Sequence, residues 1–303
     1  SYLMAPGMPW IRSPAWGARW MAVLLGGMGV ALVLLSLWRM GGWGAFGVGG
    51  VLVLFPSAYL LIYQAGYALP SYPVLLAFSA AVFALAQGSV REEQPRPFWA
   101  AAAGLLAGSA LAVSLLALPV VLAAGVWCGV GRNGRQARIH LPAFGLAALL
   151  GFSPYWLAQH LYPGAFGAVS TLVPWKQALG RLWDPALSFT LPVACGAEPS
   201  YWPDNRETLV IIPAFRHLFA GLWIGLMAAG IGLCGVRFFQ RWRRTRWPSL
   251  EALDTVVLIN GLAVVLFVTN SRSHGDSFRY LLQTVWTWPL LVAGLFRWAP
   301  RPG

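Results

Sequence analysis

The chain has 303 residues, of which 58% are hydrophobic and only 10% are charged, and its net charge is +12. Soluble domains carry about 25% charged residues, and a mean hydropathy of +0.64 leaves too few polar side chains to cover a water-facing globule. This balance excludes a disordered chain, and three cysteines exclude a disulfide scaffold. The composition indicates a polytopic membrane protein.

The expected spans follow from length, because a helix needs about 20 mostly apolar residues to cross ~30 Å of hydrocarbon. On this measure we expect about nine spans, which cover residues 20–38, 42–63, 71–87, two short helices within 98–130 that reverse near Ser114, 142–159, 213–236, 252–268 and 278–296. The predicted fold class is an all-α bundle forming a single membrane-embedded domain over residues 1–303. Its parts are N-terminal helices (20–159), one long external loop (160–212) and C-terminal helices (213–303).

The arginines predict the orientation of this bundle. The stretch RFFQRWRRTRW, residues 237–247, is the densest basic cluster, and short cytoplasmic loops carry the cation excess. Counting spans outward from it places the basic residues near 132–138 on the inside and the loop 160–212 outside. We therefore expect a multi-pass membrane protein with an external N-terminus and a cytoplasmic C-terminus. The cations lie between apolar runs, where they meet lipid headgroups, so no nucleic-acid partner is expected.

The start of the chain is unusual for such a topology. Ser1 is not an initiator methionine, and the first 19 residues lack the charged start, apolar core and cleavage site of a secretory signal. We therefore expect a truncated chain that lacks at least one earlier span. Initiation at Met4 or Met8 is the alternative.

No soluble-enzyme motif is present: the sequence has no GxxxxGK[ST], GxGxxG, HExxH, GxSxG or CxxC. Gly104 and Gly108 form a GxxxG within an apolar run. Small residues at this spacing are typical of closely packed membrane helices, so we expect a packing role for them.

The long loop places several ionisable groups among aromatic residues. Asp204 and Glu207 lie near Tyr201 and Trp202. Carboxylates beside aromatic rings suit a carbohydrate ligand, whereas Trp and Tyr also serve as simple anchors in the headgroup zone. Both interpretations remain open on composition.

A second external segment runs directly into the last span. It holds Arg272, His274 and Asp276, and it ends in Arg279 and Tyr280 at the entry of the membrane helix. Ionisable residues at membrane depth are costly and are functional candidates. A guanidinium there could hold a lipid phosphate bidentately, and snorkelling of Arg279 to the headgroups is the alternative.

Four segments resemble the GT-C membrane glycosyltransferases, which include protein O-mannosyltransferases, the lipid A aminoarabinose transferase and bacterial family 39-like proteins, and which occur in the inner membrane of bacteria. The segment FRYLL (278–282) with Pro289 is similar to their RYLLPLYP-type segment. GLLAGSALAVSLLALP (104–119) is similar to their two-short-helix segment. FSPYWLAQHLYP (152–163), which contains His160, resembles the stretch that opens their long external loop, and Ala18-Arg19-Trp20 resembles the entry to their second span.

The resemblance implies transfer of a sugar from a polyprenyl-phosphate-linked donor to an envelope glycan, lipid or protein acceptor on the outer face of the inner membrane. Arg279 and Tyr280 would engage the donor phosphate, assisted by Arg272, His274 and His160. The family's catalytic carboxylate lies in a first external loop, which the expected truncation removes. The replacement bases within reach of the outer face would then be these three acids: Asp276, Asp204 and Glu207.

No metal-ligand set is assigned, and a divalent metal ion is the one cofactor that the resemblance suggests. The alternative function is a non-enzymatic polytopic membrane protein, such as a transporter, a lipid flippase or a structural subunit. Transporters usually carry matched broken helices in two halves, and no such internal symmetry is visible in the sequence.

Overall fold

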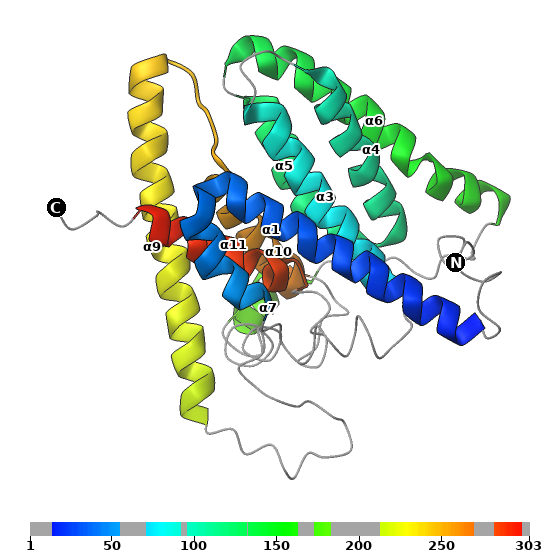
Figure 1. Ribbon diagram of the computed structural model, residues 1–303, viewed down its shortest axis with the longest axis horizontal. Coiled ribbons are helices and arrows are strands. Elements are labelled where there is room, and N and C mark those ends of the chain that lie inside the picture. Colours follow the sequence, from blue (N-terminus) through cyan, green and yellow to red (C-terminus); the bar gives the residue numbers. More distant parts are fainter. Residues whose placement is uncertain are drawn as a thin grey trace.

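The computed structural model describes residues 14–54, 71–91, 96–131, 133–162, 173–182, 213–269 and 282–298, and all regular structure within them is helical (Figure 1). Five of the helices are long and apolar enough to cross a membrane, over residues 20–53, 73–91, 134–161, 220–245 and 252–269. Shorter apolar helices cover residues 97–113, 115–130 and 286–295. The expectation of an all-α polytopic bundle is confirmed.

Helix α1 (Pro14–Leu54) joins the first two expected spans. Its backbone leaves the helical conformation at Gly41 and Gly42, and Gly42 has a φ of +61°. Only glycine adopts such a conformation without strain. The chain reverses at this point (Figure 1), so the break expected between residues 38 and 42 is present. Helix α3 (Ser71–Arg91) then packs along α1.

The long apolar run of residues 98–130 forms two helices, as predicted, named α4 (Pro97–Val113) and α5 (Leu118–Val130). Ser114 is extended, and its hydroxyl accepts a hydrogen bond from the Leu116 N–H of the short 3-10 turn η3 (Leu115–Ala117). Both helices pack against α6 (Gly134–Leu161). The contacts made by their glycines show that α4 runs parallel to α6 and that α5 runs antiparallel to it. The chain therefore reverses at Ser114.

Two predicted boundaries were wrong. Helix α6 begins at Gly134 rather than at Pro142, because the Asn133 side chain caps it by accepting a hydrogen bond from the Gln136 N–H at 2.9 Å. Proline is tolerated inside membrane helices when neighbours satisfy the freed carbonyl. Helix α9 (Pro213–Thr245) continues through most of the arginine stretch that the sequence suggested as a loop. Arginine is a good helix former, and the loop is confined to residues 246–251.

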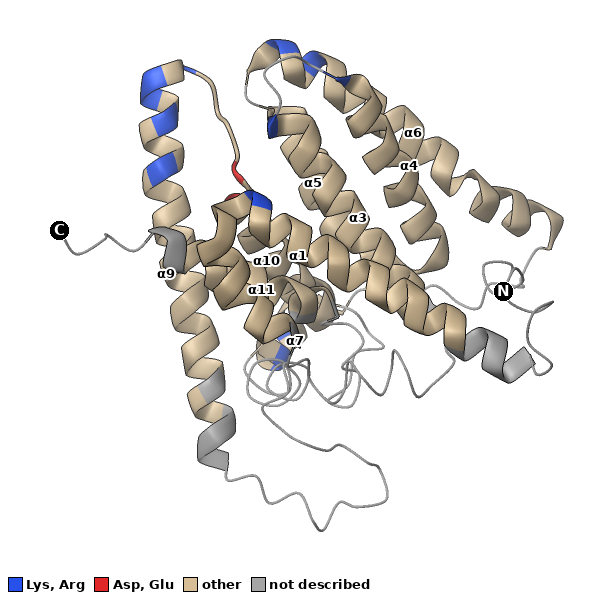
Figure 2. Cartoon of the chain, in the orientation of Figure 1, with Lys and Arg blue, Asp and Glu red and all other residues tan. Residues whose placement is uncertain are grey.

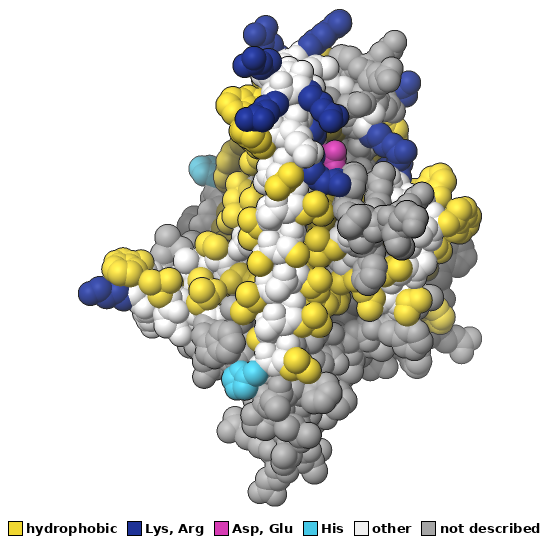
Figure 3. All heavy atoms as spheres, turned by 90° about the vertical axis from the view of Figure 1, so that its left-hand side faces the viewer, with side chains coloured by type: hydrophobic (Ala, Val, Ile, Leu, Met, Phe, Trp, Pro, Cys, Tyr) yellow, Lys and Arg dark blue, Asp and Glu magenta, His cyan; other side chains and the backbone are white. Residues whose placement is uncertain are grey.

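The remaining helices are α7 (Trp175–Arg181), α10 (Ala252–Thr269) and α11 (Leu282–Trp298). Helices α3, α10 and α11 contribute most of their described side chains to the core. By contrast, α6 and α9 expose large apolar residues such as Leu146, Leu150, Leu222 and Ile231. In Figure 3 an apolar band covers α9 below its arginine-bearing end. Such exposed faces on long apolar helices are what a lipid environment requires.

Candidate functional site

The basic residues lie mostly at one end of the bundle. Figure 2 shows Lys and Arg at the ends of α3, α6 and α9 that face the same side of the molecule, which we name the arginine end. The start of α10 lies towards this end, so α10 and α9 run in opposite directions and α10 ends at Thr269 on the other side (Figure 1). We name that side the loop end, because it carries α7 (Figure 1).

Most of the predicted site residues fall outside the described residues. Arg272, His274, Asp276, Arg279 and Tyr280 belong to residues 270–281, and the two acids of the long loop, Asp204 and Glu207, belong to residues 183–212. His160 is described: it lies in the last turn of α6 and is exposed. These assignments remain predictions.

The described residues do show how the two candidate segments are anchored. The Val173 N–H, just before α7, donates a hydrogen bond to the carbonyl oxygen of Thr269 at 2.9 Å. Thr269 is the last residue of α10, and Ala178 of α7 is buried. Part of the long loop is therefore fixed to the point from which residues 270–281 depart.

A buried polar network fixes the start of α11, where Gln283 follows Arg279 by four residues in the sequence. The Gln283 side chain donates hydrogen bonds to the Ser79 hydroxyl of α3 at 3.1 Å and to the Leu116 carbonyl of η3 at 3.0 Å. Its Oε1 accepts a hydrogen bond from the Trp286 indole at 2.6 Å. Gln283, Ser79 and Trp286 are almost inaccessible. Because an unsatisfied buried amide is costly, this network holds α3, η3 and α11 in one arrangement.

The network extends towards α10. The Thr287 hydroxyl lies 2.6 Å from the Gln283 carbonyl, to which it donates, and it accepts a hydrogen bond from Asn260 Nδ2 at 3.0 Å. The sequence analysis did not single out these residues. The signal was available, because Gln283, Thr284 and Thr287 put polar groups on one face of an otherwise apolar helix, and polar groups inside membrane helices are expensive.

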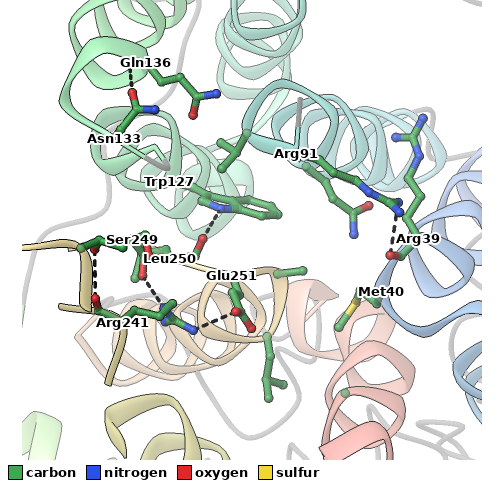
Figure 4. A pocket seen from close by; sticks show the side chains of 16 residues that line it. Arg39, Met40, Arg91, Trp127, Asn133, Gln136, Arg241, Ser249, Leu250 and Glu251 are labelled. Atoms are coloured by element: carbon green, nitrogen blue, oxygen red, sulfur yellow. Dashed lines mark hydrogen bonds and ion pairs between the residues drawn. The ribbon is translucent and has the colours of Figure 1, made fainter. Parts of the chain in front are cut away.

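A cavity of about 830 Å³ opens at the arginine end, between α1, α3, α5, α6, α9, α11 and the start of α10 (Figure 4). It is lined by Arg39, Arg91, Trp127, Arg241 and Glu251, among others. The Trp127 indole donates to the Leu250 carbonyl at 3.0 Å, which fixes one wall. Arg241 contacts Asp254 at 2.6 Å and Glu251 at 3.1 Å. These ion pairs hold the loop 246–251 against α9.

The chemistry of this cavity differs from that of the predicted site. Asp254 Oδ2 also accepts a hydrogen bond from the Glu251 N–H at 2.7 Å and so caps α10. Glu251, the acid that lines the cavity, and the neighbouring Asp254 are therefore engaged in structural contacts. Among the described residues, no group of three or more His, Cys, Asp or Glu side chains could hold a metal ion. The cavity lies at the arginine end, opposite the end of α10 at Thr269 and the start of α11, and we regard it as separate from the predicted site residues.

Comparison with known proteins agrees with the fold. No protein-family model matches the chain, and no curated protein sequence matches it. Two solved structures of ArnT from Cupriavidus metallidurans do: the apo form with a TM-score of 0.61 and 15% identity, and the form bound to undecaprenyl phosphate with 0.59 and 14%. Each alignment covers 97% of this chain and 48% of the ArnT chain. The chain thus spans about half the length of the structures it matches.

The chain is a polytopic helical membrane protein. Its fold is similar to that of ArnT over 97% of the chain. The expectation drawn from the short RYLL, two-short-helix and PYWL motifs is confirmed at the level of the fold.

Proposed function

We propose that the protein takes part in transferring a sugar from a polyprenyl-phosphate-linked donor to an acceptor on the outer face of the inner membrane. The observation that carries the proposal is the match of 97% of the chain to the ArnT fold, one of whose structures holds undecaprenyl phosphate. The acceptor would be an envelope glycan, lipid or protein. The loop end would face outward and the C-terminus would be cytoplasmic, as the arginine distribution favours.

In this proposal Arg279 and Tyr280 bind the phosphate of the donor. A guanidinium matches a phosphate with two parallel hydrogen bonds. The support from the described residues is indirect: Gln283 follows Arg279 by four residues and is held by three buried hydrogen bonds. A rigid start of α11 would lower the entropic cost of holding the arginine in a binding orientation.

The remaining predicted residues would act around the same phosphate and the acceptor. Arg272, His274 and His160 would supply further cations or hydrogen-bond donors. A general base needs only to lie within hydrogen-bond reach of the acceptor hydroxyl, and Asp276 is the candidate nearest in sequence to Arg279. The two long-loop acids, Asp204 and Glu207, are the other candidates.

The test replaces Arg279 by Ala in the full-length protein. One measurement is binding of undecaprenyl phosphate by native mass spectrometry; another is release of undecaprenyl phosphate from a sugar-linked donor, which does not require the acceptor to be known. Loss of charge-assisted hydrogen bonds should weaken binding by about 10- to 100-fold. Arg279→Lys should retain part of it. Arg243→Ala, at the arginine end, is the matched control and should bind normally.

Two outcomes would contradict the proposal. Unchanged binding and release in Arg279→Ala would remove the assigned role of the arginine. Wild-type protein that neither binds undecaprenyl phosphate nor releases it would favour the non-enzymatic alternative. Asn or Gln replacements at Asp276, Asp204 and Glu207 then identify the base, since only the base should abolish release while leaving binding intact.

A further inference from the structure

An apolar groove lies on the lipid-facing side of the bundle, between the first half of α1, α3 and α4. Its volume is about 500 Å³. Its walls are apolar, and all but one of the side chains that line it are at least partly exposed. They are Met28, Leu32, Leu35, Phe78, Ala81, Ala84, Leu85, Trp99 and Leu106, with Gly88 and Arg39.

Arg39 is the only charged residue among those lining this groove. It also lines the larger cavity at the arginine end, so it lies where the apolar groove meets the polar end of the molecule. Trp99, at the start of α4, and Gly88, near the end of α3, mark the same end of the groove. Tryptophan favours the headgroup zone of a bilayer, so this end has the composition of a membrane interface.

The Arg39 guanidinium is oriented by a single described hydrogen bond. Its NH1 donates to the carbonyl oxygen of Ala84 at 3.0 Å, which leaves other N–H groups of its five available to a ligand. The ion pairs among the described residues involve Arg237 and Arg241 and not Arg39. Arg91 lies beside it and donates to the Arg39 carbonyl at 3.4 Å (Figure 4). Two adjacent cations favour an anionic ligand.

The length of the groove limits what can fill it. Met28, Leu32, Leu35 and Arg39 are spaced by four, three and four residues, so they share one face of α1. At a rise of 1.5 Å per residue, the eleven steps from Met28 to Arg39 span about 16 Å. One leaflet of a bilayer has about half of ~30 Å of hydrocarbon, so the groove matches one acyl chain of one leaflet.

We infer that this groove binds an anionic phospholipid from the leaflet at the arginine end, with one acyl chain along α1, α3 and α4 and the phosphate on Arg39. The site lies at the opposite end of the bundle from the start of α11 and does not depend on the proposed function. A lipid bound here would fill the space between α1 and α4 and hold α1 against α3. A polyprenyl chain, which is much longer than one leaflet, fits this groove less well.

The test measures lipid binding to the full chain in detergent by native mass spectrometry, titrating phosphatidylglycerol against phosphatidylcholine. We expect one preferred phosphatidylglycerol. Arg39→Gln should weaken it by about tenfold, the loss of one charge-assisted contact. Ala81→Phe, which fills the groove and leaves Arg39 in place, should weaken it by a similar factor. Arg243→Gln, an arginine at the same end on α9, is the control and should bind normally.

Each alternative gives a different result. Equal losses in Arg39→Gln and Arg243→Gln would mean general attraction to a basic surface and would overturn the site. Displacement by inorganic phosphate together with normal binding in Ala81→Phe would mean a phosphate site without an acyl chain. Tighter binding of undecaprenyl phosphate than of phosphatidylglycerol, lost in Arg39→Gln, would overturn the assigned lipid. Since Ala81→Phe retains the arginine, the inference stays testable if Arg39→Gln does not fold.

Discussion

Close packing of α4 on α6 should make the glycines between them unusually sensitive to substitution. A Cβ atom on Gly108 would collide with the carbonyl oxygen of Ala148 and lie 2.7 Å from the Phe152 nitrogen. Ordinary contacts are about 3.5–4.0 Å. The atoms in the way belong to the backbone, so they cannot rotate aside, and the two helices must separate by roughly 1 Å.

Gly108→Ala should therefore lower the free energy of unfolding by about 1–3 kcal/mol, the cost typical of overpacking. Association of membrane helices depends on van der Waals packing, so the loss of close contact is not offset elsewhere. Gly145→Ala is the matched control, because a Cβ at Gly145 of α6 would meet nothing within 4 Å. It should be neutral or stabilising by up to ~1 kcal/mol.

The measurement is reversible unfolding in mixed micelles, followed by far-UV circular dichroism for both variants. The reasoning would be refuted if Gly108→Ala were as stable as Gly145→Ala. That result would mean that α4 and α6 are farther apart than the structure places them.

Two further predictions concern the arginine end. Asp254→Asn should destabilise the protein by about 1.5–3 kcal/mol, because the Asp254 side chain is only 8% exposed and contacts Arg241 at 2.6 Å. Glu251→Gln should cost under about 1 kcal/mol, because the Glu251 side chain is 42% exposed. Equal losses of stability in unfolding titrations of the two variants would contradict this ranking. Gly42→Ala should lower the free energy of unfolding by about 1–3 kcal/mol, because residue 42 has a positive φ. Gly44→Ala, in the helix that follows, has open space around the added methyl group and should not lower it. Thermal melting of the two variants tests this difference.

Hydrophobic length predicted the existence of nearly every described membrane helix, since a crossing needs a fixed number of apolar residues. Helix ends were predicted less well. Pro142 suggested a start and Arg237 an end, yet α6 and α9 continue past both. The Asn133 cap is a local signal, since its partner is the Gln136 N–H three residues on, and asparagine is a preferred N-cap residue; the span-length criterion did not use it. The ion pairs of Arg241 with Glu251 and Asp254 join side chains that meet only in the folded chain.

The candidate site, too, was predicted only in part from the sequence. The sequence singled out Arg279 and Tyr280 by their position at a helix entry, and the role of both stays a prediction because they lie outside the described residues. It did not reveal the network of Gln283 with Ser79, two residues 204 positions apart. Partners at such separations leave no trace in local spacing.

Composition and periodicity alone determined that this chain is a bundle of membrane helices with its arginines towards one side, because burial in lipid constrains every span in the same way. The GxxxG at Gly104 and Gly108 also indicated close packing without naming the partner helix. Only the tertiary structure decided that this partner is α6, that Gln283 fixes the start of α11, and that Arg39 stands at the head of an apolar groove. Each of these depends on which faces of separate helices meet, and that is settled by packing of the whole chain.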